Sequence, residues 1–218
     1  MLLLAAALLV AAAPQSKVPP AAHCPQAPYT APQVSGPAPA GLTCLALEVS
    51  GNADRTNPSI DPGYVVSIAP ARFPAVAPAV PEGALQGLDA QGRLLFNQTM
   101  SAGGDFHTFV PVSDATARAL VKIRLIVGNA SVDRNASLHG APTVELISVD
   151  DAHVVVAWSA NLFPQIRVRE YPNGPIIATG NGETSYTEIT VPTSAPLLVI
   201  DFSDGIHSYT RAVRVWGR

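Results

Sequence analysis

The sequence predicts an all-β protein built from two consecutive β-sandwich units, on three observations. Charged residues make up 13% of the chain, about half the usual share of roughly 25%. They are too few to coat the exposed faces of long amphipathic helices. No segment has an apolar period of 3.6 residues over more than two helical turns, whereas short apolar runs alternate with turn residues along most of the chain, as they do in β-sandwiches.

The first unit is expected over residues 42–127. Leu45, Leu47 and Val49 alternate with small or polar residues, which predicts a strand with one buried face. The turn at 89–92 ends in glycine and indicates a hairpin, and residues 113–115 are suited to capping a single helical turn. Four prolines between residues 70 and 81 exclude a central strand there. The remaining strands are expected at 64–68, 85–88, 94–99, 106–112 and 120–127.

Polar residues 128–140 are expected to form a linker, and residues 141–218 a second unit. Seven short strands separated by turn residues are typical of an immunoglobulin-like or fibronectin-III-like sandwich. Trp158 is in register with Val154 and Val156 on one strand and is expected to be the core aromatic residue. The strands are expected at 144–149, 154–158, 166–170, 176–179, 184–191, 197–202 and 210–216.

The N-terminus predicts export. Residues 2–13 carry no polar side chain, and a run of this length is shorter than the roughly 20 residues of a membrane span but fits the apolar core of a signal peptide. We expect a signal peptide over residues 1–12, a Pro-rich stalk over 13–41, and a secreted or periplasmic protein without a transmembrane segment in the mature chain. No basic residue precedes Lys17, so a start codon misplaced within a longer gene is the alternative.

Cys24 and Cys44 both follow the apolar run. In an oxidising compartment we expect them to pair and close a Pro-rich loop, at a gain of about 3 kcal/mol. Lipidation of Cys24 is disfavoured because residues 21–23 lack the pattern of a lipoprotein site. Zinc is disfavoured because neither cysteine has a CxxC partner.

Charge and motifs limit the classes of function. The net charge of −3 excludes a nucleic-acid binder that relies on a basic face. The chain contains no GxSxG, HExxH, GxGxxG or P-loop sequence. His107 and His153 are expected on outward strand positions and His139 and His207 in turns, none with a recognisable catalytic partner. No catalytic residue and no enzymatic activity are therefore expected.

Two weak metal hypotheses remain. Asp150 and Asp151 lie in one predicted inter-strand turn, and Asp201 and Asp204 lie at the end of another strand. If these loops meet at one end of a sandwich they would offer the oxygen ligands that calcium prefers, although aspartate is also an ordinary turn former. The loop 52–63 has the same two interpretations.

A copper site is the second metal hypothesis. Signal cleavage after Ala22 would place His23 at the mature N-terminus, as in copper-dependent polysaccharide monooxygenases, where an amine and imidazoles bind Cu(II). The unfavourable Pro20 and the low aromatic content of 6% argue against it.

Short segments of both units carry a family resemblance. They read LDAQGRLL at 88–95, FVP at 109–111 with ARA at 117–119, AWS at 157–159 and FSDG at 202–205. Together they resemble the C-terminal immunoglobulin-like or fibronectin-III-like β-sandwich modules of secreted bacterial peptidases and other exported multidomain proteins, over about residues 42–216. The resemblance implies a non-catalytic module, because the catalytic residues of those proteins lie in a separate domain.

The leading hypothesis is therefore an exported, non-catalytic binding, adhesion or accessory module. Its partner would be a protein or glycan outside the cytoplasm, bound through inter-strand loops or a sheet edge, with no cofactor beyond a possible calcium ion. The alternatives are a secreted enzyme, such as the copper monooxygenase with N-terminal His23, and the detached tail of a larger secreted peptidase.

Overall fold

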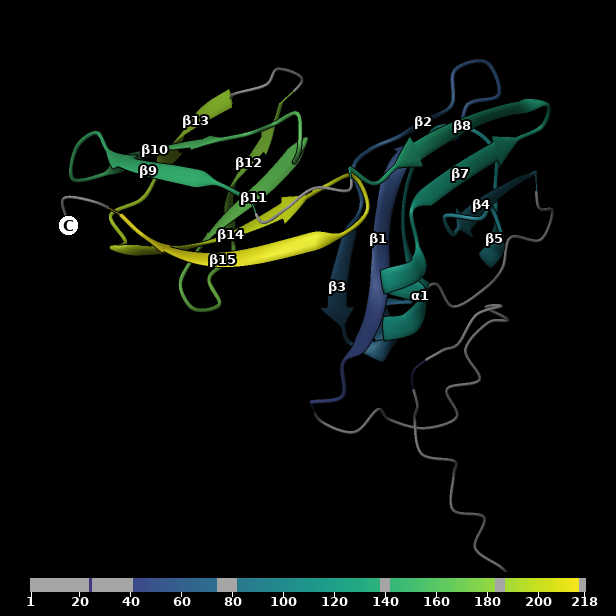
Figure 1. The fold of residues 1–218 in the computed structure, drawn as a ribbon, viewed down its shortest axis with the longest axis horizontal. Helices are drawn as coiled ribbons and strands as arrows, with labels where there is room; N and C mark the ends of the chain where they lie inside the picture. The colour runs from purple at the N-terminus through teal and green to yellow at the C-terminus, as the bar shows by residue number, and fades with distance from the viewer. Residues whose placement is uncertain (1–23, 25–40, 74–81, 138–141, 183–186, 216–218) are drawn as a thin grey trace, which may run out of the picture.

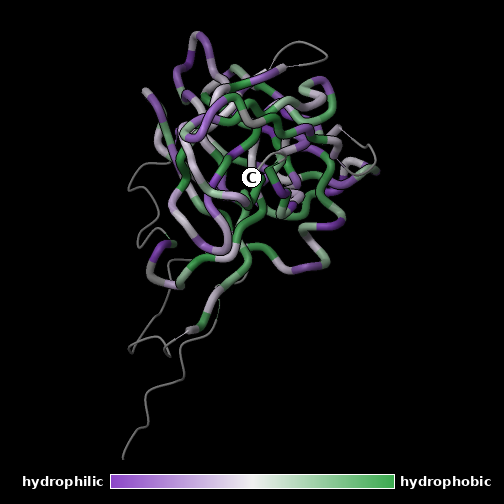
Figure 2. Tube along the Cα trace, turned by 90° about the vertical axis from the view of Figure 1, so that its left-hand side faces the viewer, coloured by the Kyte–Doolittle hydropathy of each residue, from purple (hydrophilic) through white to green (hydrophobic). Residues whose placement is uncertain are grey.

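The structure is a computed structural model that describes residues 24, 41–73, 82–137, 142–182 and 187–215. Its regular elements are almost all strands, arranged in antiparallel sheets that form two adjacent units (Figure 1). The all-β prediction is confirmed, and the sheets fit β-sandwich units. Hydrophilic residues gather mainly on the outer turns, and hydrophobic residues run through the interior (Figure 2). No helix among the described residues is long and apolar enough to cross a membrane.

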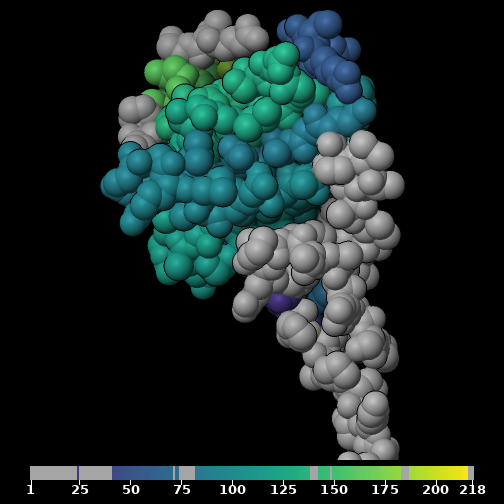
Figure 3. Space-filling model, turned by 90° about the vertical axis from the view of Figure 1, so that its right-hand side faces the viewer, coloured from purple at the N-terminus to yellow at the C-terminus, as the bar shows by residue number. Residues whose placement is uncertain are grey.

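The first unit has two facing sheets. In one, the central strand β1 (Cys44–Asn52) pairs with β6 (Asp105–Pro111) on one side and with β2 (Ser59–Ile60) and β3 (Tyr64–Ile68) on the other. The second sheet has the order β5-β4-β7-β8 and forms much of the face seen in Figure 3. Its strands are β4 (Gly83–Leu88), β5 (Leu94–Met100), β7 (Lys122–Val127) and β8 (Ala130–Asn135).

Two short helices lie at the ends of these strands. The 3-10 helix η1 (Pro70–Arg72) follows β3, and α1 (Asp114–Ala119) connects β6 to β7. The Ser113 hydroxyl caps α1 by accepting a hydrogen bond from the Thr116 backbone N–H at 3.0 Å, as the sequence indicated.

The period-two pattern of β1 separates its two faces. Leu47 and Val49 are fully buried between the sheets, against Ile123 and Leu125 of β7 and Leu85 of β4. Burial of this apolar interface stabilises the first unit by about 25 cal/mol for each Å² of apolar surface removed from water.

Residues 130–135 correct the predicted linker at 128–140, because they form β8 and complete the second sheet. The Asp133 carboxylate accepts hydrogen bonds from Arg124 on the neighbouring strand at 2.7 and 2.8 Å, and Lys122 lies 3.1 Å away. Hydrophobicity did not reveal β8, since only Val132 and Ala130 are apolar and neither is fully buried. Cross-strand ion pairs, rather than buried apolar side chains, stabilise this edge strand against β7.

The second unit also has two sheets, ordered β13-β10-β9 and β12-β11-β14-β15. Trp158 on β10 is buried at its centre, and its indole N–H donates to the Phe163 carbonyl at 2.9 Å, which confirms the predicted core aromatic residue. A Cβ at Gly180 would lie 2.6 Å from the Trp158 ring, so only glycine fits there. The strands are β9 (Val144–Ser148), β10 (His153–Trp158), β11 (Gln165–Glu170), β12 (Ile176–Asn181), β13 (Thr187–Pro192), β14 (Leu197–Ser203) and β15 (Ser208–Arg214).

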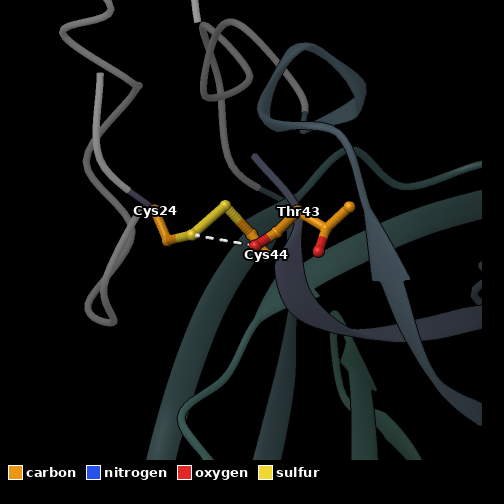
Figure 4. The surroundings of a disulfide bond; sticks show 3 residues. All are labelled: Cys24, Thr43 and Cys44. Carbon is orange, nitrogen blue, oxygen red and sulfur yellow. Dashed lines mark hydrogen bonds between the residues drawn. A yellow bond between two sulfur atoms is a disulfide. The ribbon is translucent and has the colours of Figure 1, made fainter. Parts of the chain in front are cut away.

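Cys24 and Cys44 form a disulfide with a Cα–Cα distance of 5.4 Å (Figure 4), so the predicted pairing is confirmed. Cys44 opens β1 and packs with Ala46, Ile68 and Phe73 on the outer face of the first sheet. The Cys24 sulfur lies 3.6 Å from the Thr43 carbonyl oxygen. The bridge therefore joins Cys24 to the outer face of the first sheet.

Replacing both cysteines with serine is expected to lower the free energy of unfolding by about 3 kcal/mol. The reason is that the unfolded chain regains the freedom of the loop closed over a separation of 20 residues. Urea unfolding of the oxidised wild type and the double variant measures the difference, with reduced wild type as the control. Equal urea midpoints for all three proteins would contradict the expectation.

Candidate functional site

The turn between β14 and β15, residues 203–207, inserts into the first unit. Its Ile206 is fully buried and belongs to the hydrophobic core of the first unit, together with residues such as Leu120 of the α1–β7 connection. A residue of the second sandwich therefore completes the core of the first. The two units are consequently packed together rather than merely tethered.

Backbone groups lock this turn in place. The Gly63 N–H donates to the Gly205 carbonyl at 2.9 Å, and the Ser137 N–H donates to the Asp204 carbonyl at 2.9 Å. The buried Ser203 hydroxyl donates to the Gly63 carbonyl. Gly205 has φ +107°, and a Cβ there would lie 2.8 Å from the Asn135 carbonyl oxygen, so this close approach requires glycine.

Asp204 and His207 hold the turn from within. The Asp204 side chain is buried and accepts backbone hydrogen bonds from Ile206 at 2.9 Å and from His207 at 2.7 Å. The His207 ring places Nδ1 2.9 Å from the Asp204 carboxylate and Nε2 3.1 Å from the Ala117 carbonyl of α1. Both ring nitrogens face acceptors, so only the protonated ring donates to both. The hydrogen bond to Asp204 raises the pKa of His207 above its ordinary value.

We call residues 203–207 and their contacts with the first unit the joint. This geometry predicts that the stabilisation provided by the joint depends on pH. A raised folded-state pKa means that His207 stabilises the fold fully below its unfolded value of about 6.5 and loses that contribution as pH rises through the folded value. His207→Gln is expected to cost about 2 kcal/mol at acid pH, the scale of a charge-assisted hydrogen bond, and less at alkaline pH. Chemical unfolding at several pH values measures the difference between wild type and variant.

His153→Gln is the matched control for this prediction. The exposed His153–Asp150 pair should contribute little, so this variant keeps the pH profile of the wild type. A cost for His207→Gln that grows with rising pH would contradict the assignment.

A charged bridge joins the units beside this turn. Arg167 of β11 donates to both carboxylate oxygens of Glu48 on β1, at 2.6 and 3.0 Å. Its guanidinium lies 3.8 Å from the centroid of the Tyr64 ring, a cation–π distance. His107 Nε2 lies 2.9 Å from Glu48. Burial acts to raise the pKa of Glu48, but the hydrogen bonds from Arg167 and His107 outweigh it and leave that pKa lowered.

Where the units diverge beyond this bridge, they enclose a cleft of about 410 Å³. Strands β15 and β3, which lie beside each other in Figure 1, both contribute residues to its lining. One wall is β3, and the other is the outward face of the sheet that contains β11, β14 and β15. The cleft is lined by Tyr64, Val65, Val66, Ser67, Arg167, Arg169, Asp201, Ser208 and Thr210.

The sheet wall is polar and internally paired. Arg169 donates to both oxygens of Asp201 at 2.9 and 3.1 Å, and the Thr210 hydroxyl donates to Asp201 at 2.6 Å. Neighbouring strands hold these groups in register, because Arg169 pairs opposite Val199 and Asp201 opposite Thr210. The wall therefore offers hydrogen-bonding groups with little net charge.

The inner end of the cleft holds an unsatisfied group. Tyr64 is 1% exposed, and its hydroxyl is buried without a hydrogen-bond partner among the described residues. Burial raises the pKa of this phenol far above its ordinary value, so it stays protonated and able to donate. A buried hydroxyl without a hydrogen-bond partner destabilises the fold, because its lost hydration is not replaced.

The aspartates proposed as calcium ligands do not come together. Asp150 and Asp151 lie in the β9–β10 turn, whereas Asp204 follows β14 at the opposite end of the second sandwich (Figure 1). Asp201 lies on the outward sheet face, bound to Arg169. Asp150 and Asp151 thus lie at the other end of this sandwich from Asp204, and calcium binding by these residues stays a prediction from the sequence. No group of three or more His, Cys, Asp or Glu suited to a metal occurs among the residues that the structure describes.

The histidines fall into two groups. His107 and His153 lie half-exposed on strands, as expected. His207 does lie in a turn, but there it is largely buried in the joint, a role that sequence reasoning missed. His23 and His139 lie outside the described residues. The sequence did not identify the cleft residues either. Arg167 and Arg169 alternate with buried apolar residues, which indicates a charged face that points outward. The sequence does not show that this face lies opposite β3, because that depends on the topology.

Models of known protein families and curated protein sequences were compared with the chain, and neither comparison gives a match.

Truncating the buried residue of the joint tests the packing of the two units. Ile206→Ala is expected to lower the free energy of unfolding by about 2–5 kcal/mol, the range for deleting a buried isoleucine. Ile176→Ala, at a position 51% exposed, is the matched control and should change stability by no more than about 0.5 kcal/mol. Equal effects of the two substitutions on urea unfolding would show that Ile206 is not part of a core.

Proposed function

We propose that this protein is an exported, non-catalytic module that binds a partner outside the cytoplasm in the cleft between its two sandwiches. The observation that carries the proposal is the joint at residues 203–207, because it holds two sheets in a fixed relation and so preforms a polar cavity of about 410 Å³. Binding sites in proteins are usually preformed concavities at such junctions.

The strand order supports a fibronectin-III-like second unit. The fourth strand, β12, pairs with β11 rather than with β13. In immunoglobulin constant domains the corresponding strand joins the other sheet, whereas fibronectin type III domains have the arrangement found here. Such modules commonly serve as binding or spacer units, in line with the resemblance to the modules of exported multidomain proteins.

Export is supported by two independent features. Residues 2–13 form an apolar run of signal-peptide length, and Cys24 and Cys44 form a disulfide, a bond that persists in oxidising compartments. Both features favour a secreted or periplasmic location.

A binding role fits the cleft better than catalysis. The carboxylate of Asp201 is engaged by Arg169 and Thr210, and that of Glu48 by Arg167 and His107. Acid–base and nucleophilic catalysis need such groups free to exchange protons or attack. The copper hypothesis rests on His23, which lies outside the described residues, so it stays a prediction from sequence.

Filling the cleft tests the proposal. Thr210→Trp places an indole at an exposed position of the cleft wall, and Thr190→Trp places it at an exposed position of β13 in the other sheet. The mature protein and both variants are titrated against the isolated cell-envelope fraction of the source organism. Wild type and Thr190→Trp should bind alike, and Thr210→Trp should bind at least about tenfold more weakly.

The opposite result is equally clear. Undiminished binding by Thr210→Trp would show that the partner uses another surface. Loss of binding in the presence of chelator alone would favour a metal-dependent protein over the module proposed here.

A further inference from the structure

We infer that the cleft takes an extended, uncharged peptide segment, which adds as a strand to the free edge of β3. This inference rests on the proposed binding function and specifies its ligand. It is carried by the backbone of β3, by the charge pairing of the opposite wall and by the absence of an exposed ring face in the lining.

The direction of the β3 backbone groups follows from the register. Val65 lies opposite Leu47 of β1, yet its N–H donates to the Ser208 hydroxyl at 2.7 Å, away from β1. Backbone direction alternates along a strand, so the N–H and C=O of Ser67 point the same way as those of Val65. These groups lie on the side of β3 that borders the cleft.

The second unit occupies only the first part of this edge. Gly63 exchanges hydrogen bonds with Gly205 and Ser203, and the Val65 N–H bonds to Ser208. Beyond that point the carbonyl of Val65 and both backbone groups of Ser67 have no hydrogen-bond partner among the described residues. Unpaired groups on an edge strand are a template for another strand. The turn thus forms hydrogen bonds with the start of this edge of β3, and an incoming peptide would form further ones along the same edge.

The opposite wall favours an uncharged segment. Arg169 is paired with Asp201, and Arg167 with Glu48, so the positive and negative charges near the cleft balance. A charged ligand side chain would have to displace one of these bidentate pairs. The Ser208 hydroxyl accepts from the Val65 N–H and keeps its proton to donate, and the Thr210 hydroxyl donates to Asp201 and keeps its oxygen to accept. These two groups suit small polar side chains such as serine and threonine.

Size and ring exposure favour a short peptide over a carbohydrate. The volume of about 410 Å³ lies near the lower end of the range of roughly 300–1,000 Å³ for ligand sites, enough for a short stretch of strand. Tyr64 supplies the aromatic ring of the lining, but Arg167 covers its face and it is only 1% exposed. No ring face of the lining is thus open for stacking against a sugar.

The test uses a capped, fluorescein-labelled hexapeptide of alternating threonine and valine, titrated into the mature protein and followed by fluorescence anisotropy. Ser67→Pro removes the outward N–H without breaking a bond to β1, since proline is tolerated at such edge positions. Ser67→Ala keeps the N–H and is the matched control. Ser67→Pro should weaken binding at least about tenfold, and Ser67→Ala by less than about twofold.

A second measurement does not depend on the folding of a variant. The same hexapeptide with alternate backbone nitrogens methylated lacks the N–H groups that would bond to Val65 and Ser67, and it should lose measurable binding to the wild type. Hydrogen exchange of the Ser67 amide should slow when the unmodified peptide binds.

The outcomes separate this inference from the proposed function. No binding of the hexapeptide to wild type, equal binding to Ser67→Pro, or unchanged Ser67 exchange would overturn strand addition. If envelope binding still depended on Thr210 in that case, the cleft would remain the binding site with another ligand. Competition by cellohexaose that is insensitive to Ser67→Pro would replace the peptide with a glycan.

Discussion

The burial of the β14–β15 turn in the first sandwich is the constraint on which the rest of the structure depends. Ile206 belongs to the second unit in sequence but is buried in the core of the first. The Asp204 carboxylate accepts a hydrogen bond from the Ile206 backbone N–H within the turn, and the His207 ring contacts the Ala117 carbonyl of α1. Gly205 permits the backbone to approach Asn135 closely. Because apolar burial, backbone hydrogen bonds and an ion pair act at one short segment, separating the units would expose a core side chain and leave buried polar groups unpaired.

The cleft is a geometric consequence of this joint. The turn sets β15 against the start of β3, where these two edge strands are in contact, and the units diverge beyond that contact. The Arg167–Glu48 pair and the covered Tyr64 ring brace the point of divergence. Beyond it, the open edge at Ser67 faces a wall of paired charges and hydroxyls.

The features predicted correctly are those that short stretches of sequence encode. Alternation at Leu45, Leu47 and Val49 identified β1, and the register of Trp158 with Val154 and Val156 placed the core aromatic residue. Cys24 and Cys44, the two cysteines of the chain, were expected to pair. Most of the features that were missed depend on contacts between distant segments, whereas β8 was missed although it pairs with its hairpin neighbour β7. β8 resembles a polar linker because Asp133 is stabilised by charges on β7 rather than by burial. Residues 204–207 resemble an ordinary surface turn, and nothing near them indicates that Gly63 and Ala117 lie alongside. The separation of Asp150 and Asp151 from Asp204 could not be foreseen either, since the sequence does not show which turns share an end.

The central claim is that the two sandwiches form one body held by residues 203–207. Residual dipolar couplings of backbone amides in the mature protein test it most directly, because they report the orientation of each unit and any motion between the units. We expect one alignment tensor to fit the amides of both units in the arrangement described. Two tensors of different magnitude would mean that the units reorient independently, and the preformed cleft would then have to be abandoned.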